Sequence, residues 1–420
     1  MYPTLTDEER GLLNGQGGEG VSLAMRILVE SARLLGAEEL TPISSAHIDG
    51  CLYHGDSGTL FAEKLVDLGA RVSVYTTLNV GALDLLHPGR DRLPPHEQKM
   101  ARRMMKAYVA LGCIETWTCA PYQAGHRPKY GQDVAFGESN AIAFCNSVLG
   151  ARTNRYGDFL DICAAICGRV PRIGLHITAN RRATILVDAS GLPPSFFDED
   201  IAFAILGYWL GLAFVGAVVA FDGLIDPNED HLKALGAAAA SSGSIGLFHV
   251  IGVTPEAPTR DQAFGGVPPQ QIVKLDLAML ERARNGLSTI GCEHGARIDA
   301  VAIGSPHLSA GELRALDRML AGRKCQVPFY ACTSRNSLQL VTGEGLPQRL
   351  EASGVVIVAD TCIVVTPILP ASGGVLVTNS GKFAHYTPST TGYEVLFANL
   401  RDCVQSAIDG RVPVGCGAGA

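Results

Sequence analysis

The hydrophobic and polar positions of the chain change period repeatedly along its length. Residues 21–35 and 94–111 carry apolar side chains at helical spacing, which predicts helices, the second with a basic face. Short apolar runs between clusters of glycine, proline and serine predict strands elsewhere. These predicted strands span residues 39–48, 71–77, 172–178, 183–187, 245–253, 327–331 and 354–359.

Strands and helices alternate most clearly in the last third of the chain. Residues 300–320 contain an apolar strand, a Gly-Ser-Pro-His turn and a helix with Ser309 as its N-cap and Glu312 at its third position. The strand at 327–331 leads through a Cys-Thr-Ser-Arg turn into another helix. Such units form parallel sheets whose turns gather at one edge. We therefore expect an α/β fold of mostly parallel sheets flanked by helices.

One uncharged segment, residues 201–221, has the length of a membrane-spanning helix. Acidic residues flank it on both sides, and no lysine or arginine anchors either end. Gly207, Gly211 and Gly216 divide the segment into a helix with a small-residue face and a β-branched piece. We expect a buried helix and a buried strand here, and no association with a membrane.

The composition is that of a folded chain with more than one core. At 420 residues, with 47% hydrophobic and 18% charged residues, it has room for two or three domains or lobes. The stretch at 265–269 is rich in glycine and proline, so we expect interleaved lobes of roughly 1–265 and 266–420. The net charge of −7 includes no basic block, which argues against nucleic acid and favours a small organic substrate or a protein subunit.

The cysteine usage bears on the cellular compartment. Twelve cysteines are spaced irregularly, unlike a disulfide framework. Residues 1–14 carry acidic side chains in place of the basic start and apolar run of a secretory signal. We therefore expect a cytoplasmic protein whose reduced thiols are available to bind metal.

The segment at 118–155 combines residue types that a packed core rarely contains. It holds Cys119 on a loop rich in proline and glycine, then Glu-Ser-Asn at 138–140, and then Arg152 and Arg155. A thiolate, a carboxylate, small polar donors and two guanidinium groups this close in sequence indicate a functional site. The alternative is a surface loop that leads into an ordinary buried helix, and composition does not choose between the two.

Two cysteines, Cys119 and Cys362, follow predicted element ends in turn-rich sequence. Soft thiolates that converge from separate loops suit an iron or iron–sulfur centre, although neither cysteine belongs to a Cys-x-x-Cys motif. The competing interpretation is a cysteine nucleophile with His307 or His54 as its base. The cationic side chains that could hold a carboxylate or a phosphate are Lys382, Arg152, Arg155 and Arg335.

Six short motifs stand out when the chain is read in order. They are Thr-Cys-Ala-Pro-Tyr at 118–122, Gly-Glu-Ser-Asn-Ala at 137–141, Asn-Ser-Val-Leu-Gly-Ala-Arg-Thr-Asn-Arg at 146–155, Gly-Ser-Pro-His-Leu-Ser at 304–309, Ala-Asp-Thr-Cys at 359–362 and Ser-Gly-Lys at 380–382. Together they resemble the large subunit of the aconitase X family, over nearly the whole chain. The resemblance implies an aconitase-like α/β fold, with several lobes around a central cleft, and a hydro-lyase with an iron or iron–sulfur centre.

The family comprises cis-3-hydroxy-L-proline dehydratases and mevalonate 5-phosphate dehydratases. The mevalonate type usually has Gly-Cys-Pro-His where this chain has Ser305. The resemblance therefore implies two thiolate ligands, Cys119 and Cys362, with Glu138 as a further metal ligand, and a [2Fe-2S] cluster in preference to a three-cysteine cluster. The implied reaction converts cis-3-hydroxy-L-proline to 1-pyrroline-2-carboxylate, with dehydration of mevalonate 5-phosphate as the alternative.

We expect the remaining polar residues to act on a small hydroxy acid. The expected catalytic residues are Lys382, His307 and Ser139, and the expected substrate-binding residues are Ser57, Asn140, Arg152, Arg155 and Ser380. Family members fuse a small swivelling domain or recruit it as a separate subunit, so the resemblance implies a small-subunit partner that carries this domain. A cysteine-nucleophile hydrolase and a non-catalytic iron–sulfur protein are the alternatives from other functional classes.

Overall fold

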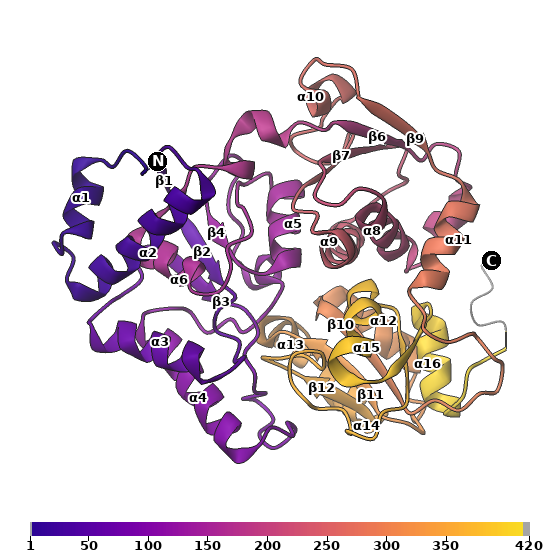
Figure 1. Cartoon of the computed structure of the whole chain (residues 1–420). Helices are drawn as coiled ribbons and strands as arrows, with labels where there is room; N and C mark the ends of the chain where they lie inside the picture. Colours follow the sequence, from indigo (N-terminus) through magenta and orange to yellow (C-terminus); the bar gives the residue numbers. More distant parts are fainter. Residues whose placement is uncertain (1, 415–420) are drawn as a thin grey trace. The chain divides into compact units, whose positions relative to one another are not determined.

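The computed structural model describes residues 2–414 and divides the chain into two compact units (Figure 1). Unit 1 comprises Met1–Leu83 and Leu93–Arg182, and unit 2 comprises Asp84–Arg92 and Ala183–Ala420. The main division therefore lies at residues 182–183, whereas the sequence indicated 265–269. Gly265 ends helix α10 as its left-handed C-cap inside unit 2, so this glycine terminates a helix instead of linking two lobes.

Unit 1 is built around a three-stranded parallel sheet. Its helices are α1 (Asp7–Leu13), α2 (Glu19–Leu35), α3 (Asp56–Asp67), α4 (Pro95–Ala110), α5 (Ser139–Ser147) and α6 (Leu160–Cys167), with 3-10 turns at Pro121–Ala124, Gly174–His176 and Thr178–Arg181. Its strands are β1 (Leu40–Pro42), β2 (Ser45–Ile48), β3 (Tyr75–Leu78), β4 (Ala135–Phe136) and β5 (Arg169–Pro171). β2 lies between β3 and β4 and is parallel to both, so three strands end at one edge.

Two strand predictions for unit 1 need correction. The predicted strand at 39–48 is split into β1, which pairs antiparallel with β5, and β2, which joins the parallel sheet. The predicted strand at 172–178 is not a strand; it contains 3-10 turns. Here the side chain of Asn154 donates to the carbonyl of Ile173 and accepts from the N–H of Leu175, so a side chain takes the place of a neighbouring strand.

Unit 2 contains two parallel sheets. Its helices are α7 (Pro194–Phe197), α8 (Ala202–Ala213), α9 (Glu229–Gly243), α10 (Arg260–Phe264), α11 (Leu277–Gly286), α12 (Ala310–Leu320), α13 (Arg335–Thr342), α14 (Leu346–Ala352), α15 (Gly381–Thr391) and α16 (Leu400–Asp409). Its strands are β6 (Ile185–Asp188), β7 (Val219–Asp222), β8 (Phe248–Val250), β9 (Gln271–Lys274), β10 (Ala300–Leu308), β11 (Phe329–Thr333), β12 (Val355–Val358), β13 (Val375–Thr378) and β14 (Glu394–Phe397). One sheet has the order β8-β7-β6-β9 and the other β12-β11-β10-β13-β14.

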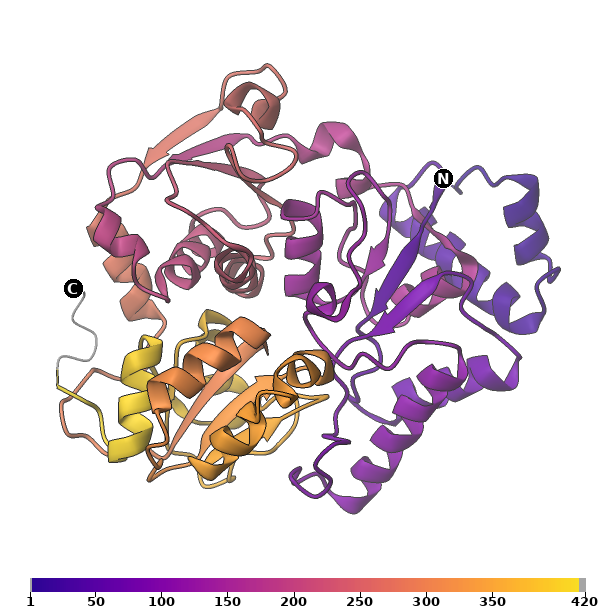
Figure 2. The ribbon, with the colours of Figure 1, turned by 180° about the vertical axis from the view of Figure 1, so that it is seen from behind.

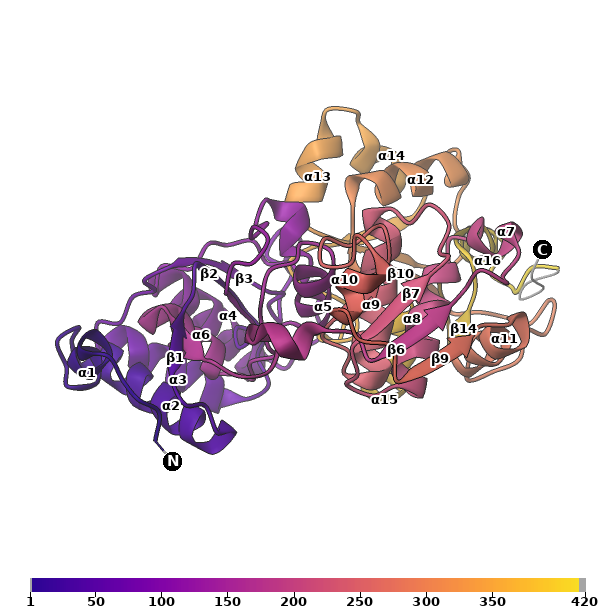
Figure 3. The same cartoon turned by 90° about the horizontal axis from the view of Figure 1, so that it is seen from above.

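The five-stranded sheet is buried on both faces by alternating side chains. Val301 and Ile303 of β10 pack on the side of α12, α13, α14 and α16, whereas Ala300 and Ala302 face the opposite core, which includes Phe383 of α15. Helices therefore cover both faces (Figures 2 and 3). The strand order reverses between β10 and β13, and a doubly wound sheet binds ligands at such a point, outside the carboxyl ends of its strands.

The apolar segment at 201–221 forms α8 and β7, which confirms the predicted buried helix and strand. A Cβ atom at Gly207 would lie 2.1 Å from the carbonyl oxygen of Leu235 in α9, so the two helices approach at backbone distance. Within residues 2–414, no helix combines the length and apolar content that crossing a membrane requires. The small-residue face is explained by this helix–helix contact.

Candidate functional site

The carboxyl edge of the parallel sheet in unit 1 carries polar residues directly after its strands. Asp49 follows β2, Asn79 follows β3, and Glu138 lies two residues after β4. Nδ2 of Asn79 donates a hydrogen bond to Oδ1 of Asp49. A Cβ atom at Gly137 would lie 2.6 Å from Cβ of Asp49, so the chain before Glu138 packs directly on Asp49. Sequence reasoning missed Asp49 and Asn79, although a polar residue just after a strand of a parallel sheet is the signal that could have found them.

Glu138 organises the start of helix α5. Its carboxylate is the N-cap of the helix and accepts the N–H of Ala141 at 2.7 Å. The Ser139 hydroxyl donates to the other oxygen of Glu138 at 3.3 Å, and Nδ2 of Asn140 donates to the first. Glu138 and Asn140 are almost fully buried. The structure thus brings together three residues that the sequence indicated as site residues.

Cys119 lies on the loop that these residues hold. Nδ2 of Asn140 donates a hydrogen bond to the backbone carbonyl of Cys119 at 3.1 Å. The N–H of the preceding Thr118 donates to the carbonyl of Leu78, the last residue of β3, so the loop starts at the same sheet edge. Tyr122 donates its hydroxyl proton to Oδ1 of Asn140 at 3.1 Å and so fixes the amide orientation. Cys119 itself is buried.

Three predicted substrate-binding residues of unit 1 are more exposed than Glu138 and Asn140. Arg152 is half-buried, its Nη1 donates to the carbonyl of His176 at 3.4 Å, and its Nε is buried without a hydrogen-bond partner. Arg155 is exposed and forms an isolated backbone bridge with Phe136 of β4. Ser57 is exposed in the first turn of α3. The buried Nε of Arg152 is therefore a polar group of this region without a hydrogen-bond partner in the protein.

In unit 2, Cys362 lies on the loop after β12 and is buried. Nε2 of His307 lies 3.1 Å from the carbonyl oxygen of Thr361, so this predicted catalytic histidine contacts the cysteine loop. Both guanidinium arms of Arg335 donate to the carboxylate of Asp360, at 2.6 and 2.7 Å. Burial raises the pKa of Asp360, and Arg335 opposes that rise. The loop is thereby anchored at Asp360 and at Thr361.

Residues 84–92, which lie between two segments of unit 1 in the sequence, also support the Cys362 loop. The carboxylate of Asp84 accepts the N–H of Ala359, and the carboxylate of Asp360 accepts the N–H of Leu85. Arg92 donates its backbone N–H to the carbonyl of Pro367 and its Nε to the carbonyl of Ile368. These contacts explain why Asp84–Arg92 belongs to unit 2. Because the partners are far apart in the sequence, no sequence pattern indicated these contacts.

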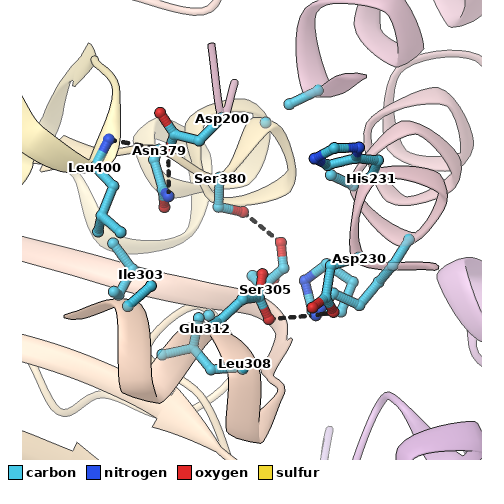
Figure 4. Close-up of a pocket in the computed structure, with 18 of the residues that line it drawn as sticks. Asp200, Asp230, His231, Ile303, Ser305, Leu308, Glu312, Asn379, Ser380 and Leu400 are labelled. Carbon is cyan, nitrogen blue, oxygen red and sulfur yellow. Dashed lines mark hydrogen bonds and ion pairs between the residues drawn. The ribbon is translucent and has the colours of Figure 1, made fainter. Parts of the chain in front are cut away.

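A cavity of about 280 Å³ opens beside β10 and α15 in unit 2, where the strand order reverses (Figure 4). The Ser380 hydroxyl caps α15 by accepting the N–H of Phe383 and donates to the backbone carbonyl of Ser305. The Gly-Ser-Pro-His sequence at 304–307 is part of β10, where the register with β11 shifts, and is not the separate turn that the sequence predicted. The polar residues that line the cavity are Asp200, Asn228, Asp230, His231, Lys233, Ser305, Glu312, Asn379 and Ser380.

The charged residues of this cavity are mostly acidic. Nζ of the buried Lys233 pairs with Asp230 at 2.9 Å and with Glu312. Although burial opposes both shifts, these contacts raise the pKa of Lys233, and Lys233 together with Ser309 lowers the pKa of Asp230. Lys382, in the first turn of α15, is half-buried. The predicted Ser309–Glu312 capping box of α12 is confirmed and leaves Glu312 beside Lys233.

The side chains that could bind a metal are cysteines and carboxylates at the carboxyl edges of two sheets, the three-stranded sheet of unit 1 and the five-stranded sheet of unit 2. Within residues 2–414, no three histidine, cysteine, aspartate or glutamate side chains form a complete ligand set. Cys119 in unit 1 and Cys362 in unit 2 are soft donors of the kind that iron–sulfur centres use, and each thiol is buried on a hydrogen-bonded loop at the carboxyl end of parallel strands. Each thiol is therefore of the chemical type that such a centre binds.

Comparisons with known proteins agree along the whole chain. The family models named aconitase X first, second and third domain match residues 3–179, 183–285 and 298–409. The cis-3-hydroxy-L-proline dehydratase of Pseudomonas aeruginosa is 41% identical over 98% of this chain and 71% of its own length. The phosphomevalonate dehydratase large subunit of Methanothermobacter thermautotrophicus is 37% identical over 95% of this chain and 97% of its own length.

A solved structure agrees with these sequence matches. The crystal structure of Thermococcus kodakaraensis aconitase X in its holo form superimposes with a TM-score of 0.85 at 33% identity. The superposition covers 96% of this chain and 100% of the Thermococcus chain. The predicted α/β fold of mostly parallel sheets flanked by helices is therefore confirmed, and the chain belongs to the aconitase X family.

Proposed function

We propose that this chain is the large subunit of a hydro-lyase that dehydrates cis-3-hydroxy-L-proline to 1-pyrroline-2-carboxylate. The observation that carries the proposal is the 41% identity, over 98% of the chain, to a cis-3-hydroxy-L-proline dehydratase. Ser305 gives independent support, because it stands where the mevalonate type of the family usually has a cysteine. The identity extends over nearly the whole chain, and Ser305 lines the cavity of unit 2. The proposal therefore does not rest on the fold alone.

The proposed reaction removes water from a β-hydroxy acid. The α-carbon loses a proton, the C–O bond at the β-carbon breaks, and the hydroxyl leaves as water; the cyclic enamine then tautomerises to the pyrroline carboxylate. Loss of the α-proton requires positive charge near the substrate carboxylate, for which we propose Arg152, Arg155 and Lys382. The other proposed site residues are Ser139 and His307, as catalytic groups, and Ser57, Asn140 and Ser380, which would bind substrate.

The proposal includes an iron or iron–sulfur centre with Cys119 and Cys362 as thiolate ligands. Glu138 is the proposed further ligand, and two thiolates favour a [2Fe-2S] cluster over a three-cysteine cluster. When bound, such a centre supplies a Lewis acid for the leaving hydroxyl group. Asn140 and His307 contribute by holding the loops that carry the two cysteines, through the carbonyls of Cys119 and Thr361.

We also propose a separate small subunit and a cytoplasmic location. Relatives named large subunit match this chain over 97% and 100% of their own length, which supports a two-subunit organisation. We place the catalytic base on the small subunit, because the swivelling domain of aconitase carries the catalytic serine. No disulfide joins the cysteines of residues 2–414, which suits a reducing compartment.

Turnover by the assembled enzyme tests the substrate. The chain is co-expressed with a candidate small subunit and given cis-3-hydroxy-L-proline and mevalonate 5-phosphate in separate assays, with the dehydrated product identified by mass. We expect turnover of cis-3-hydroxy-L-proline. Preferential turnover of mevalonate 5-phosphate would contradict the proposal. That outcome is the second candidate, since several relatives are named phosphomevalonate dehydratase large subunit.

Iron analysis tests the centre and separates the proposal from other classes. We expect iron in anaerobically purified protein and its loss in Cys119→Ser and Cys362→Ser. The matched control is Cys292→Ser, because Cys292 is an exposed free cysteine. Turnover without iron would point to a cysteine nucleophile, and iron without turnover of either acid would point to a non-catalytic iron–sulfur protein. Absence of iron from the anaerobic protein would refute the metal proposal.

A further inference from the structure

A carboxylate lies fully buried beneath the sheet edge of unit 1, where the proposed reaction gives it no part. Asp161 stands in the first turn of α6 and has no exposed surface. Its Oδ2 accepts the backbone N–H of Asp49 at 2.6 Å and that of Gly50 at 3.0 Å. Its Oδ1 accepts the N–H of Ile162 at 2.6 Å. Three backbone donors thus compensate a charge that burial alone makes unfavourable.

These hydrogen bonds hold the turn after β2, the central strand of the sheet. The turn carries the side chain of Asp49, to which Nδ2 of Asn79 donates from the end of β3. The end of β4 is in contact as well, since a Cβ atom at Gly137 would lie 3.0 Å from Oδ2 of Asp161 and 2.6 Å from Cβ of Asp49. Asp161 therefore lies where the ends of all three strands meet, in contact with the backbone at Gly137.

A buried carboxylate at this place is not explained by stability. Burial raises the pKa of Asp161 to about 7, which shows that the protein favours its neutral form more than water does. An apolar side chain of similar size would avoid that cost, but it could not accept the N–H groups of Asp49 and Gly50. The geometry of the turn is what the carboxylate provides.

We propose that Asp161 is a positioning residue for the proposed dehydration. By accepting the N–H groups of Asp49 and Gly50, it holds the Asp49–Asn79 pair at the carboxyl edge of the sheet, where a parallel sheet presents groups to a ligand. The inference rests on the proposed function for its substrate. It does not require Asp161 to touch that substrate.

The test is Asp161→Asn in the complex with the small subunit, with cis-3-hydroxy-L-proline as substrate. Asparagine has one acceptor oxygen, so it cannot serve both the turn and Ile162. We expect kcat/KM to fall on the order of tenfold or more, since small displacements of site groups cost that much. Iron content should stay at the wild-type level. The amide protons of residues 49 and 50 should exchange faster. The control is Asp158→Asn, an exposed carboxylate three residues earlier.

The pH profile separates positioning from a purely structural role. The ionised carboxylate is the better acceptor, so wild-type kcat/KM should fall as the pH drops through about 7, and this limb should be absent in Asp161→Asn. Four other titratable groups around Asp161 stay neutral near pH 7, because burial raises the pKa values of Cys51, Tyr108, Cys113 and Cys163. The neighbouring Asp49 carboxylate adds to the rise in the pKa of Asp161.

A second variant covers the case in which Asp161→Asn does not fold. Asn79→Ala removes the hydrogen bond to Asp49 and leaves the buried carboxylate in place, and we expect a similar loss of kcat/KM. A folded Asp161→Asn with wild-type kcat/KM, pH profile and amide exchange would overturn the inference, as would unchanged kinetics in Asn79→Ala if Asp161→Asn is unfolded. If the wild type does not turn over cis-3-hydroxy-L-proline, the proposed function fails, and amide exchange at residues 49 and 50 alone decides on Asp161.

Discussion

Nδ2 of Asn140 donates a hydrogen bond to the backbone carbonyl of Cys119 at 3.1 Å, and this contact joins the first turn of helix α5 to the cysteine loop. The same amide donates to Glu138 and accepts the Tyr122 hydroxyl proton. Asn140 therefore ties a carboxylate, a cysteine loop and an aromatic ring into one polar cluster with almost no exposed surface. Such a fully hydrogen-bonded cluster is rigid, and its loss leaves buried polar groups unpaired.

We expect Asn140→Ala to lower the free energy of unfolding by about 2–3 kcal/mol, because three partners lose a hydrogen bond in a buried site. The Cys119 loop should also become more mobile, so iron should be lost faster to a chelator. Thermal unfolding and the rate of iron loss measure the two effects. Asn285→Ala, at an exposed helical position, is the control and should change stability by less than about 0.5 kcal/mol. Equal stability of the two variants would contradict the role given to Asn140.

Ser305 is the position that we expect to separate the two types of the family. Its side chain is buried, and its own carbonyl accepts the Ser380 hydroxyl proton, a contact that a change of side chain leaves in place. Ser305→Cys should raise the iron and sulfide content per chain and lower turnover of cis-3-hydroxy-L-proline by about tenfold, since a third thiolate changes the cluster. The control Ser372→Cys adds a thiol at an exposed site. Unchanged metal content in Ser305→Cys would count against the assignment.

Two buried histidines of unit 1 should make the fold sensitive to acid. Nδ1 of His47 and Nδ1 of His126 both contact Oγ1 of Thr77, at 2.8 and 2.7 Å, and Nε2 of His126 contacts the Ser45 hydroxyl. Burial lowers the pKa of each histidine to about 3. The unfolded chain binds these protons below about pH 6.5, and the folded chain does not. Stability is therefore lost as the pH falls from about 6.5 towards 3, by about 2 kcal/mol per histidine at pH 5.

The measurement is the difference in Tm between pH 7.5 and pH 5. We expect a clear fall for the wild type and a smaller fall for His126→Gln, which cannot bind the proton in either state. His54→Gln is the matched control, because His54 is exposed. If His126→Gln keeps the full pH dependence of the wild type, His126 is not the source of the acid sensitivity.

Gly304 should be intolerant of any side chain. Its φ of 99° is unfavourable for other residues, and a Cβ atom would lie 2.1 Å from the carbonyl oxygen of Cys332 in β11. We expect Gly304→Ala to cost more than about 2 kcal/mol and to shift the neighbouring Ser305 away from its cavity. The control is Gly311→Ala in the first turn of α12, where a Cβ atom meets nothing closer than 3.5 Å. Denaturant unfolding of the two variants compares them, and equal stabilities would contradict this reading of Gly304.

The sequence alone was sufficient to predict the elements that depend on interactions between residues close together in the chain. The capping residues Ser309 and Glu312 fix the start of α12, and alternating apolar side chains place β10, β11 and β12 between two cores. The short spacing from Cys119 to Asn140 indicated a functional site but left a surface loop as the alternative, and the structure places the cysteine loop, the carboxylate and the amide in one hydrogen-bonded cluster. Where the sequence was wrong, as at 172–178, the side chain of Asn154 bonds the backbone and replaces a strand partner.

Only the tertiary structure decided which distant residues support the candidate site. Asp161 accepts the N–H of Asp49 across more than a hundred residues, and Asp84 accepts the N–H of Ala359 across more than two hundred and seventy. Neither pair of residues leaves a periodic or compositional signal in the sequence. Each hydrogen bond depends on where a strand ends in the folded sheet, and not on the residues that flank the two partners in the sequence. The sequence by itself thus determined most of the elements and the resemblance to the family, and it indicated the region of the Asn140 cluster. The structure decided what holds the strand ends of the site in place, since those hydrogen bonds exist only after the sheets have formed.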